Sequence, residues 1–242
     1  MSDADRTALV TGAGRGLGLA FATELLARGY RVLAAARKPE GSEGLAALGA
    51  AHGERLVPLA LDVGDPRSVA AGAAAAGEHT NALHLLVNNA GINSRSVPEG
   101  QGNVRLGSLE PEGFLAMMRV NALGPALVTQ ALLPLLAAGG GRVVNISSWL
   151  GSIAGKTAGG NYGYAASKAA LNMVGRAMAF DLAAQGVVSV QINPGWVQTD
   201  MGGQRAKLTP EESVKGILDV AERLTPDDAG HFLQWDGTPH EW

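Results

Sequence analysis

Tyr164 and Lys168 are four residues apart and follow Ser148 by 16 and 20 residues. A phenol and an amine at this spacing are suited to proton transfer. A phenol is a poor acid near neutrality, so it needs a neighbouring fixed cation that favours the phenolate before it can exchange protons at useful rates. On a helix the side chains at positions i and i+4 project from the same face, so both could reach one pocket. An exposed pair without any chemical role would show the same spacing, and other features of the chain must separate the two interpretations.

Length, charge and composition restrict what these residues can serve. The 242 residues are enough for one sizeable α/β domain, which we expect to cover residues 1–242. A net charge of -3 with scattered basic residues predicts no nucleic-acid partner and no membrane-surface partner. The chain has no cysteine, and its five histidines lack metal-ligand spacing, so we expect no metal site. No apolar run approaches the roughly 20 residues of a membrane span, and we expect a cytoplasmic protein with a small-molecule partner.

Short apolar runs alternate with helix-length segments along the chain. Strands are predicted at residues 7–10, 31–35, 56–61, 83–87, 142–146, 187–192 and 232–235. Because parallel strands need crossover connections, this alternation predicts a Rossmann-type, doubly wound parallel sheet of about seven strands with helices on both faces. Pro134 should kink or shorten the helix predicted at 122–138. The irregular stretches 91–109 and 194–209 each follow a strand, and α/β folds bind ligands at the carboxyl ends of their strands.

A glycine-rich loop follows the first strand directly: residues 11–18 read Thr-Gly-Ala-Gly-Arg-Gly-Leu-Gly and lead into an amphipathic helix ending near Arg28. Glycines permit a tight turn and the close approach of a pyrophosphate to the helix N-terminus, where free N–H groups and the helix dipole favour negative charge. The second strand ends at Arg37, where the simple dinucleotide fingerprint has an acidic ribose ligand, and an arginine there suits a 2′-phosphate. Arg15 supplies a second cation, so NADP(H) is favoured over NAD(H). Glu40 is the rival ribose contact.

Asp62 ends the third predicted strand and has two interpretations. Its carboxylate could accept a hydrogen bond from the adenine amino group of a dinucleotide. It could equally cap the next helix together with Asp65. Both interpretations stay open on the sequence alone.

Six motifs occur in order at near-normal spacings and together indicate a family. They are the glycine-rich loop, Asn88-Asn89-Ala90-Gly91, Asn121, the segment 141–148, Tyr164-x-x-x-Lys168 and Pro194-Gly195. With these motifs the chain resembles the short-chain dehydrogenase/reductase family over essentially its whole length. Within that family, the segments 159–164, 194–203 and 232–237 look like those of the C-factor and sniffer-type carbonyl reductases.

The resemblance implies a nicotinamide hydride donor and four catalytic side chains. Hydride attack on a carbonyl makes an alkoxide, so the site needs donors aimed at that oxygen and a proton to deliver. Ser148 would polarise the carbonyl and Tyr164 would act as the acid. Lys168 would hold the nicotinamide ribose and favour tyrosinate, while Asn121 would fix a water that links the relay to solvent. Asn121 could also cap the apolar helix that it opens.

The residues expected to bind the cofactor lie in the loops that follow the strands. They are Gly12, Gly14, Arg15, Gly16, Leu17, Gly18, Arg37, Asp62, Val63, Asn89, Ala90, Gly91, Tyr164, Lys168, Pro194, Gly195, Val197 and Thr199. Thr199 is similar to the family position that contacts the nicotinamide carboxamide, and Pro194-Gly195 would turn the chain beneath the ring. Asn88 and Asn89 could instead only tie the fourth strand to its neighbours.

Substrate contacts are expected from Ser148, Tyr164, Trp149 and Trp196, with further walls from 93–109, Leu150, Ile153 and 196–205. The two tryptophans could equally belong to the hydrophobic core. Ser147 and Ser148 would point to opposite faces of a strand, and aligning the segment from residue 141 with the family places the catalytic serine at Ser148. Tyr162 lacks a lysine four residues later, which favours Tyr164. The segment 151–161 is longer than the common family spacing and predicts a distinctive wall of the site.

These residues predict NADPH-dependent reduction of a carbonyl to an alcohol. The alternative is a nucleotide-binding regulatory or signalling protein of the C-factor type with little turnover, against which the complete set of four catalytic residues argues. An NAD-dependent alcohol dehydrogenase is disfavoured by Arg15 and Arg37. The apolar helices expected at 114–138 and 164–184 suggest a homo-oligomer joined by those two faces.

Overall fold

A computed structural model describes residues 6–242 and contains one seven-stranded parallel sheet. The strands are β1 Thr7–Thr11, β2 Arg31–Ala36, β3 Leu56–Ala60, β4 Leu85–Asn88, β5 Arg142–Ile146, β6 Val188–Asn193 and β7 Phe232–Gln234. They lie in the order β3-β2-β1-β4-β5-β6-β7, and every neighbouring pair is parallel. All seven predicted strands are present, with small shifts at their ends.

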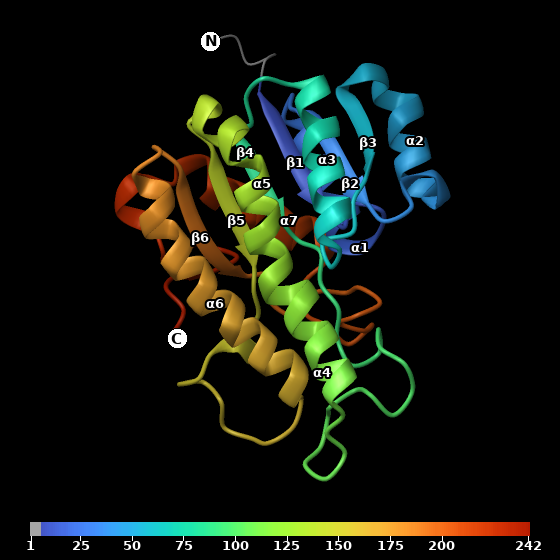
Figure 1. Cartoon of the computed structure of the whole chain (residues 1–242), viewed down its shortest axis with the longest axis vertical. Helices are drawn as coiled ribbons and strands as arrows, with labels where there is room; N and C mark the ends of the chain where they lie inside the picture. The colour runs from blue at the N-terminus through green and yellow to red at the C-terminus, as the bar shows by residue number, and fades with distance from the viewer. Residues whose placement is uncertain (1–5) are drawn as a thin grey trace.

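Helices cover both faces of this sheet (Figure 1). They are α1 Gly16–Ala27, α2 Glu43–His52, α3 Pro66–His79, α4 Pro111–Met118, α5 Gly124–Gly139, α6 Tyr162–Ala183 and α7 Pro210–Arg223. One apolar core contains buried side chains of α1, α2 and α7, such as Phe21, Leu45 and Ile217. The other contains buried side chains of α3 and α5, such as Val69 and Leu132. The predicted fold class is therefore confirmed, whereas the predicted domain boundary at residue 1 lies outside the described residues.

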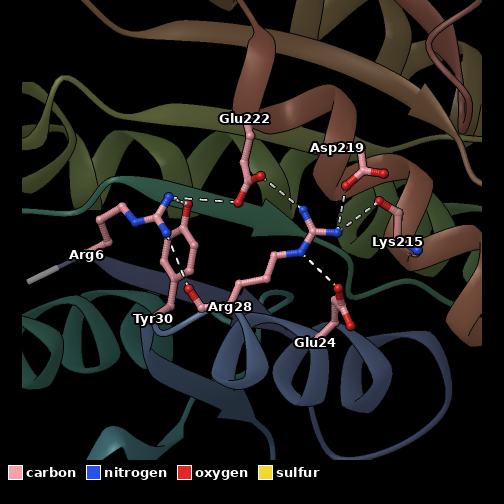
Figure 2. Close-up of polar contacts among 7 residues, drawn as sticks. All are labelled: Arg6, Glu24, Arg28, Tyr30, Lys215, Asp219 and Glu222. Atoms are coloured by element: carbon pink, nitrogen blue, oxygen red, sulfur yellow. Dashed lines mark hydrogen bonds and ion pairs between the residues drawn. The ribbon is translucent and has the colours of Figure 1, made fainter. Parts of the chain in front are cut away.

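An ion-pair cluster joins α1 to α7 (Figure 2). The guanidinium of Arg28, at the end of α1, lies 2.9 Å from the carboxylate of Glu24, 2.8 Å from that of Asp219 and 3.1 Å from that of Glu222. Arg6 approaches Glu222 at 3.8 Å. Because several charges share a partly buried cation, the cluster is a network rather than an isolated surface pair. It fixes α1, whose N-terminus follows the glycine-rich loop.

Residues 111–139 form one continuous helical run, in which a π-helical turn at Arg119–Leu123 separates α4 from α5. Pro134 lies inside α5, and the helix continues beyond it to Gly139, so the predicted shortening is wrong. The run is long and apolar enough to cross a membrane by length and composition, which corrects the expectation that no segment approaches a membrane span. Its inner face packs into the core through Val128, Leu132 and Leu136, as in a core helix of a soluble protein.

The loops that follow β1, β4, β5 and β6 meet at one edge of the sheet, because the strands are all parallel and their carboxyl ends coincide. Figure 1 shows the loops before α4 and α6 extending beyond this edge at the bottom of the view. The neighbours β1 and β4 lie where the strand order reverses direction. Such a switch point is where doubly wound sheets form their ligand crevice.

Candidate active site

The glycine-rich loop forms a cradle for an anion. Gly12 and Gly16 have φ values of +67° and +54°, in the left-handed region that favours glycine. A Cβ atom on Gly18 would collide with the carbonyl oxygen of Gly12, and one on Gly12 would lie 3.0 Å from the Cα atom of Ala90. Among the described residues, no side chain caps the N-terminus of α1, and its first turn has no acidic residue. The free N–H groups of this turn therefore fit the pyrophosphate of a dinucleotide.

Two arginines border this cradle. Arg37 follows β2 and is exposed at the position where an acidic ribose ligand would otherwise stand. The Nη1 atom of Arg15 lies 2.9 Å from Oδ2 of Asp200, in a pair whose side chains are 79% and 82% exposed. Solvent screens such a pair strongly, so Arg15 keeps most of its capacity to bind a phosphate. Glu40, the rival ribose contact, is exposed in a 3-10 turn.

Asp62 and Asp65 differ in the structure. Asp65 caps α3 and accepts a hydrogen bond from the N–H of Arg67 at 2.9 Å. Asp62 is no helix cap, because its Oδ1 atom accepts from the N–H of Gly64 at 2.9 Å, in the loop before α3 begins at Pro66. The capping interpretation is therefore right for Asp65 and wrong for Asp62. The contact of Asp62 with an adenine stays a prediction, as does that of the adjacent, buried Val63.

Asn88 and Asn89 hold strands together. The Nδ2 atom of Asn88 donates to Oδ1 of Asn145 at 2.9 Å and to the Thr129 hydroxyl at 3.1 Å. Asn89 donates through its side chain to the Thr11 carbonyl at 2.8 Å and through its backbone to the Thr11 hydroxyl at 3.0 Å. These contacts join β4 to β5, α5 and β1, in agreement with the structural interpretation. They also place Ala90 beside Gly12 in the floor of the cradle.

The two serines after β5 point to different partners. The hydroxyl of Ser147 donates to Oδ1 of Asn172 at 2.6 Å in the interior. The Ser148 hydroxyl instead acts on the phenol of Tyr164, whose pKa it lowers, and it accepts from the N–H of Leu150 at 3.1 Å. Tyr162 belongs to the partly exposed first turn of α6. The geometry therefore brings Ser148, rather than Ser147, to Tyr164.

Lys168 follows Tyr164 by one helical turn and is buried. Its Nζ atom donates to the carbonyl of Ile146 at 2.7 Å and lies 5.8 Å from the centroid of the Tyr164 ring. Burial raises the pKa of Tyr164 to about 12, although the neighbouring Ser148 side chain acts to lower it. Burial also lowers the pKa of Lys168 to about 8. Burial thus outweighs any stabilisation of the phenolate by the ammonium group.

Asn121 lies in the π-helical turn, buried inside a continuous helix, so it is not a helix cap as one interpretation had it. Its Oδ1 atom accepts from the N–H of Ile92 at 2.8 Å, and its Nδ2 atom donates to the Ile92 carbonyl at 2.8 Å and to the Ser167 hydroxyl at 2.9 Å. The backbone carbonyl of Asn121 has Pro125 at the i+4 position, which has no N–H to donate. The role of Asn121 in fixing a water stays a prediction.

Ser167 is a contact that sequence reasoning missed. Its hydroxyl accepts from Asn121 and donates to the carbonyl of Tyr164 at 2.7 Å, so it connects the π-helical turn to the catalytic turn of α6. A serine three residues after Tyr164 can return a hydrogen bond to that carbonyl, which is the signal in the sequence that could have found it. Gly91 closes the same region. A Cβ atom there would lie 3.3 Å from Oδ1 of Asn121 and 3.6 Å from Nζ of Lys168, so glycine leaves room beside both.

The segment after β6 crosses the glycine-rich loop. Gly195 has a φ of +79°, and Oδ1 of Asn193 accepts from the N–H groups of Gly195 and Trp149 at 3.2 and 3.1 Å. A Cβ atom on Gly16 would lie 3.8 Å from Cγ2 of Thr199. Thr199 thus lies beside the glycine-rich loop, and the cofactor contacts of Pro194, Gly195, Val197 and Thr199 stay predictions. Asn193, which no sequence motif indicated, connects this segment to the one after β5.

Trp149 and Trp196 are 51% and 47% exposed, so neither belongs to the hydrophobic core. The indole N–H of Trp196 donates to the Gly202 carbonyl at 2.8 Å, which orients this ring at the edge of the post-β6 segment. Ile153, also expected in the wall, is exposed as well. The loop after β4 lines an open cavity of about 600 Å³, with Ser94 and Val104 among its walls. Exposed apolar side chains thus border the catalytic edge on several loops.

Comparison with known proteins defines the class. The family model for short chain dehydrogenases matches residues 6–209, and the chain belongs to this family. The predicted resemblance is therefore confirmed. The chain is a short-chain oxidoreductase with a Rossmann-type fold.

Individual relatives narrow the comparison. The chain is 42% identical to the C-signal of Myxococcus xanthus over 164 residues, which are 67% of this chain and 95% of that protein. The structure of an NADPH-bound carbonyl reductase from chicken fatty liver is similar with a TM-score of 0.89 and 37% identity, covering 98% of this chain and 99% of that one. The carbonyl reductase Sniffer of D. melanogaster is similar with a TM-score of 0.91 and 31% identity, covering 98% and 100%. Both expected branches, C-factor and sniffer, are thus among the similar proteins.

Proposed function

We propose that this chain reduces the carbonyl group of a small organic substrate to an alcohol, with Tyr164 as the general acid. The cofactor is NADP(H), in agreement with similar structures that hold NADPH or NADP. The observation that carries the proposal is that Ser148 acts on the phenol of Tyr164 beside Lys168, at the same edge of the sheet as the glycine-rich cradle. Two hydroxyl donors side by side suit one developing oxyanion.

When bound, NADPH supplies the hydride. Ser148 donates a hydrogen bond to the carbonyl oxygen and thereby polarises the bond that is reduced. The raised pKa of Tyr164 keeps its phenol protonated at neutral pH, so the proton is present when the oxygen becomes an alkoxide. An alkoxide is a far stronger base than a phenolate, and the proton moves from Tyr164 to it.

The other residues hold the cofactor and restore the proton. In this proposal Lys168 holds the nicotinamide ribose, and its positive charge stabilises the phenolate that remains after transfer. The carbonyl of Asn121 binds a water that returns a proton to the relay. Arg15 and Arg37 hold the 2′-phosphate, and the N–H groups at the start of α1 hold the pyrophosphate. Asp62 contacts the adenine and Thr199 the carboxamide.

A nucleotide-binding signalling protein with little turnover is the second candidate, favoured by the similarity to the C-signal. The Ser148–Tyr164 contact favours an enzyme, since a signalling protein has no need of it. Oxidation of NADPH with a panel of ketones, aldehydes, quinones and pteridines distinguishes the two. We expect turnover on at least one carbonyl class, and tight NADPH binding with turnover on none would identify the signalling protein.

We also propose a homo-oligomer joined through the outer faces of α5 and α6. Met173 and Phe180 are exposed two turns apart on α6, and Leu123 is exposed at the start of α5. Exposed apolar side chains gathered on two helices are typical of a protein interface. Size-exclusion chromatography with light scattering tests this proposal, and a mass near 24.7 kDa at micromolar protein would contradict it. The cytoplasm as the location of the protein stays a prediction.

A further inference from the structure

Two asparagines in facing loops adopt a backbone conformation that L residues rarely adopt. Asn103 and Asn161 each have a φ of +53°, and they are the only non-glycine residues with positive φ between residues 6 and 242. Asn103 lies in the loop after β4, whereas Asn161 directly precedes α6. The N–H of Asn161 donates to the carbonyl of Val104 at 3.0 Å. Such conformations persist where the surrounding structure determines them, and they gather at functional sites.

The side chain of Asn103 is fully engaged with the backbone. It is 1% exposed, and its Nδ2 atom donates to the carbonyls of Gln101 at 2.8 Å and Glu110 at 3.0 Å. Its Oδ1 atom accepts from the N–H of Glu110 at 2.9 Å. These bonds close the segment 104–109 at both ends and attach it to Glu110, the residue before α4. A side chain so buried and engaged has no surface left for a substrate.

The turn around Asn103 packs directly on the first turn of α6. A Cβ atom on Gly163 would lie 3.2 Å from Cβ of Asn103, and one on Gly160 would lie 3.1 Å from the carbonyl oxygen of Val104. Gly163 immediately precedes Tyr164. Because the two turns pack this closely, a shift of Asn103 toward α6 would displace the start of that helix.

We propose that Asn103 is a positioning residue for the catalytic tyrosine. It holds the loop after β4 against residues 160–163, so that the loop and the Tyr164 turn form one rigid unit. The Asn121–Ser167 bridge also holds this turn, through the carbonyl of Tyr164. Removal of the Asn103 side chain releases one support of this turn and lets the phenol leave its contact with Ser148. This inference rests on the proposed role of Tyr164 as the acid.

The variant Asn103→Gly tests the proposal, because glycine tolerates the left-handed backbone and removes the whole side chain, including its Cβ atom beside Gly163 and its amide. The readout is kcat for a small aldehyde, too short to reach the loop, per active site counted by NADPH titration. We expect kcat to fall roughly tenfold to 10²-fold, the scale for a slightly misplaced catalytic group, with unchanged KM and NADPH affinity. Asn103→Asp should be worse, because its carboxylate faces the carbonyls of Gln101 and Glu110.

Thr80→Ala is the matched control for a simple loss of stability. The Thr80 hydroxyl bonds to the backbone of Ala82 and to the Thr7 hydroxyl in a loop before β4, at the opposite edge of the sheet. We expect this variant to lower the melting temperature and to keep wild-type kcat. Wild-type kcat per site in Asn103→Gly, or a loss confined to bulky substrates, would overturn the positioning role.

Tyr164→Phe in the same assay separates this inference from the proposed function. An inactive Tyr164→Phe together with a fully active Asn103→Gly refutes only the positioning role. A Tyr164→Phe variant that keeps its turnover refutes the role of the tyrosine as the acid, and the positioning role with it. Reduced kcat in both variants, with intact NADPH binding, supports both.

Discussion

The glycine-rich cradle after β1 consists mainly of backbone groups, whereas the turn of α6 that contains Tyr164 and Lys168 is held by side chains. The cradle is made of backbone: glycines with φ of +67° and +54° and a helix N-terminus without a side-chain cap, flanked by exposed Arg15 and Arg37. The catalytic turn is made of buried side chains from distant segments, such as the Asn121–Ser167 bridge to Tyr164 and the Ser147–Asn172 bond. Contacts in solvent are weak and adjustable, whereas buried polar contacts are costly to break. Substitutions at the catalytic turn should therefore have large effects on turnover or stability, and substitutions of the exposed arginines should have smaller effects on cofactor binding.

The largest contrast is expected between the adjacent serines. Ser148→Ala should lower kcat roughly 10²-fold or more, because it removes a donor to the oxyanion while leaving the fold intact. Ser147→Ala should instead keep kcat and destabilise the protein by about 1–3 kcal/mol, since it leaves Oδ1 of the buried Asn172 without its hydroxyl donor. Steady-state kinetics and urea unfolding of both variants check this. A catalytic defect in Ser147→Ala with normal Ser148→Ala would reverse the assignment.

The buried lysine should make stability depend on pH. Between about pH 8 and 10.5 the unfolded chain holds a proton on Lys168 that the folded chain lacks, so the free energy of unfolding should rise with pH, on the order of 2–3 kcal/mol. Tyr164 acts oppositely: the folded chain keeps its proton between pH 10 and about 12, so stability falls there. Urea unfolding of the cofactor-free protein across this range measures both effects. Lys168→Met should abolish the rise in the free energy of unfolding. A rise that persists in this variant would show that Lys168 is not its cause.

Cofactor preference should respond to the exposed cations by a smaller amount. Two charge-assisted contacts to a 2′-phosphate predict that NADPH binds more tightly than NADH by on the order of 1 to 3 kcal/mol. Arg37→Asp should reverse the preference, because a carboxylate repels the phosphate and accepts from ribose hydroxyls. Fluorescence titration of both cofactors measures it. Equal affinities of the wild type for NADPH and NADH would contradict the assignment of Arg15 and Arg37 as ligands of the 2′-phosphate.

The smallest effect is expected at Asp200, which pairs with Arg15 in solvent. Asp200→Asn should tighten NADPH binding by less than about 1 kcal/mol, since the pair is highly exposed and its loss frees the guanidinium for the phosphate. The gain should shrink as salt is added, because the interaction is screened. Titrations at low and high ionic strength test this. Weaker binding in Asp200→Asn would instead indicate that the carboxylate orients Arg15 for the cofactor.

Sequence patterns predicted the sheet and the cradle because their signals are local. Strands buried on both faces form continuous apolar runs, as in β1, and a glycine loop between a strand and a helix requires only neighbouring residues. The π-helical turn at Asn121 and the bond from Ser167 to Tyr164 depend on contacts between segments far apart in the sequence. No spacing rule reports those contacts.

Contacts between distant segments also decide the roles of residues that the sequence left with two interpretations. Asp62 and Asp65 have identical chemistry, and only the start of α3 at Pro66 makes Asp65 the cap. Trp149 and Trp196 have a core-like composition signal, yet they lie in loops beyond the ends of β5 and β6, where nothing covers them fully. The left-handed conformation of Asn103 likewise depends on Glu110 and α6, which are distant in sequence, as well as on the nearby carbonyl of Gln101.

The most direct test of the account is single-turnover hydride transfer from NADPH to a good carbonyl substrate by the wild type, Tyr164→Phe and Tyr162→Phe. Tyr164→Phe should bind NADPH with wild-type affinity and transfer hydride roughly 10²-fold or more slowly, the usual scale for a removed general acid. Tyr162→Phe, which lacks a lysine one turn later, should remain close to the wild type. Near wild-type transfer by Tyr164→Phe, or an inactive Tyr162→Phe, would contradict the assignment of the acid.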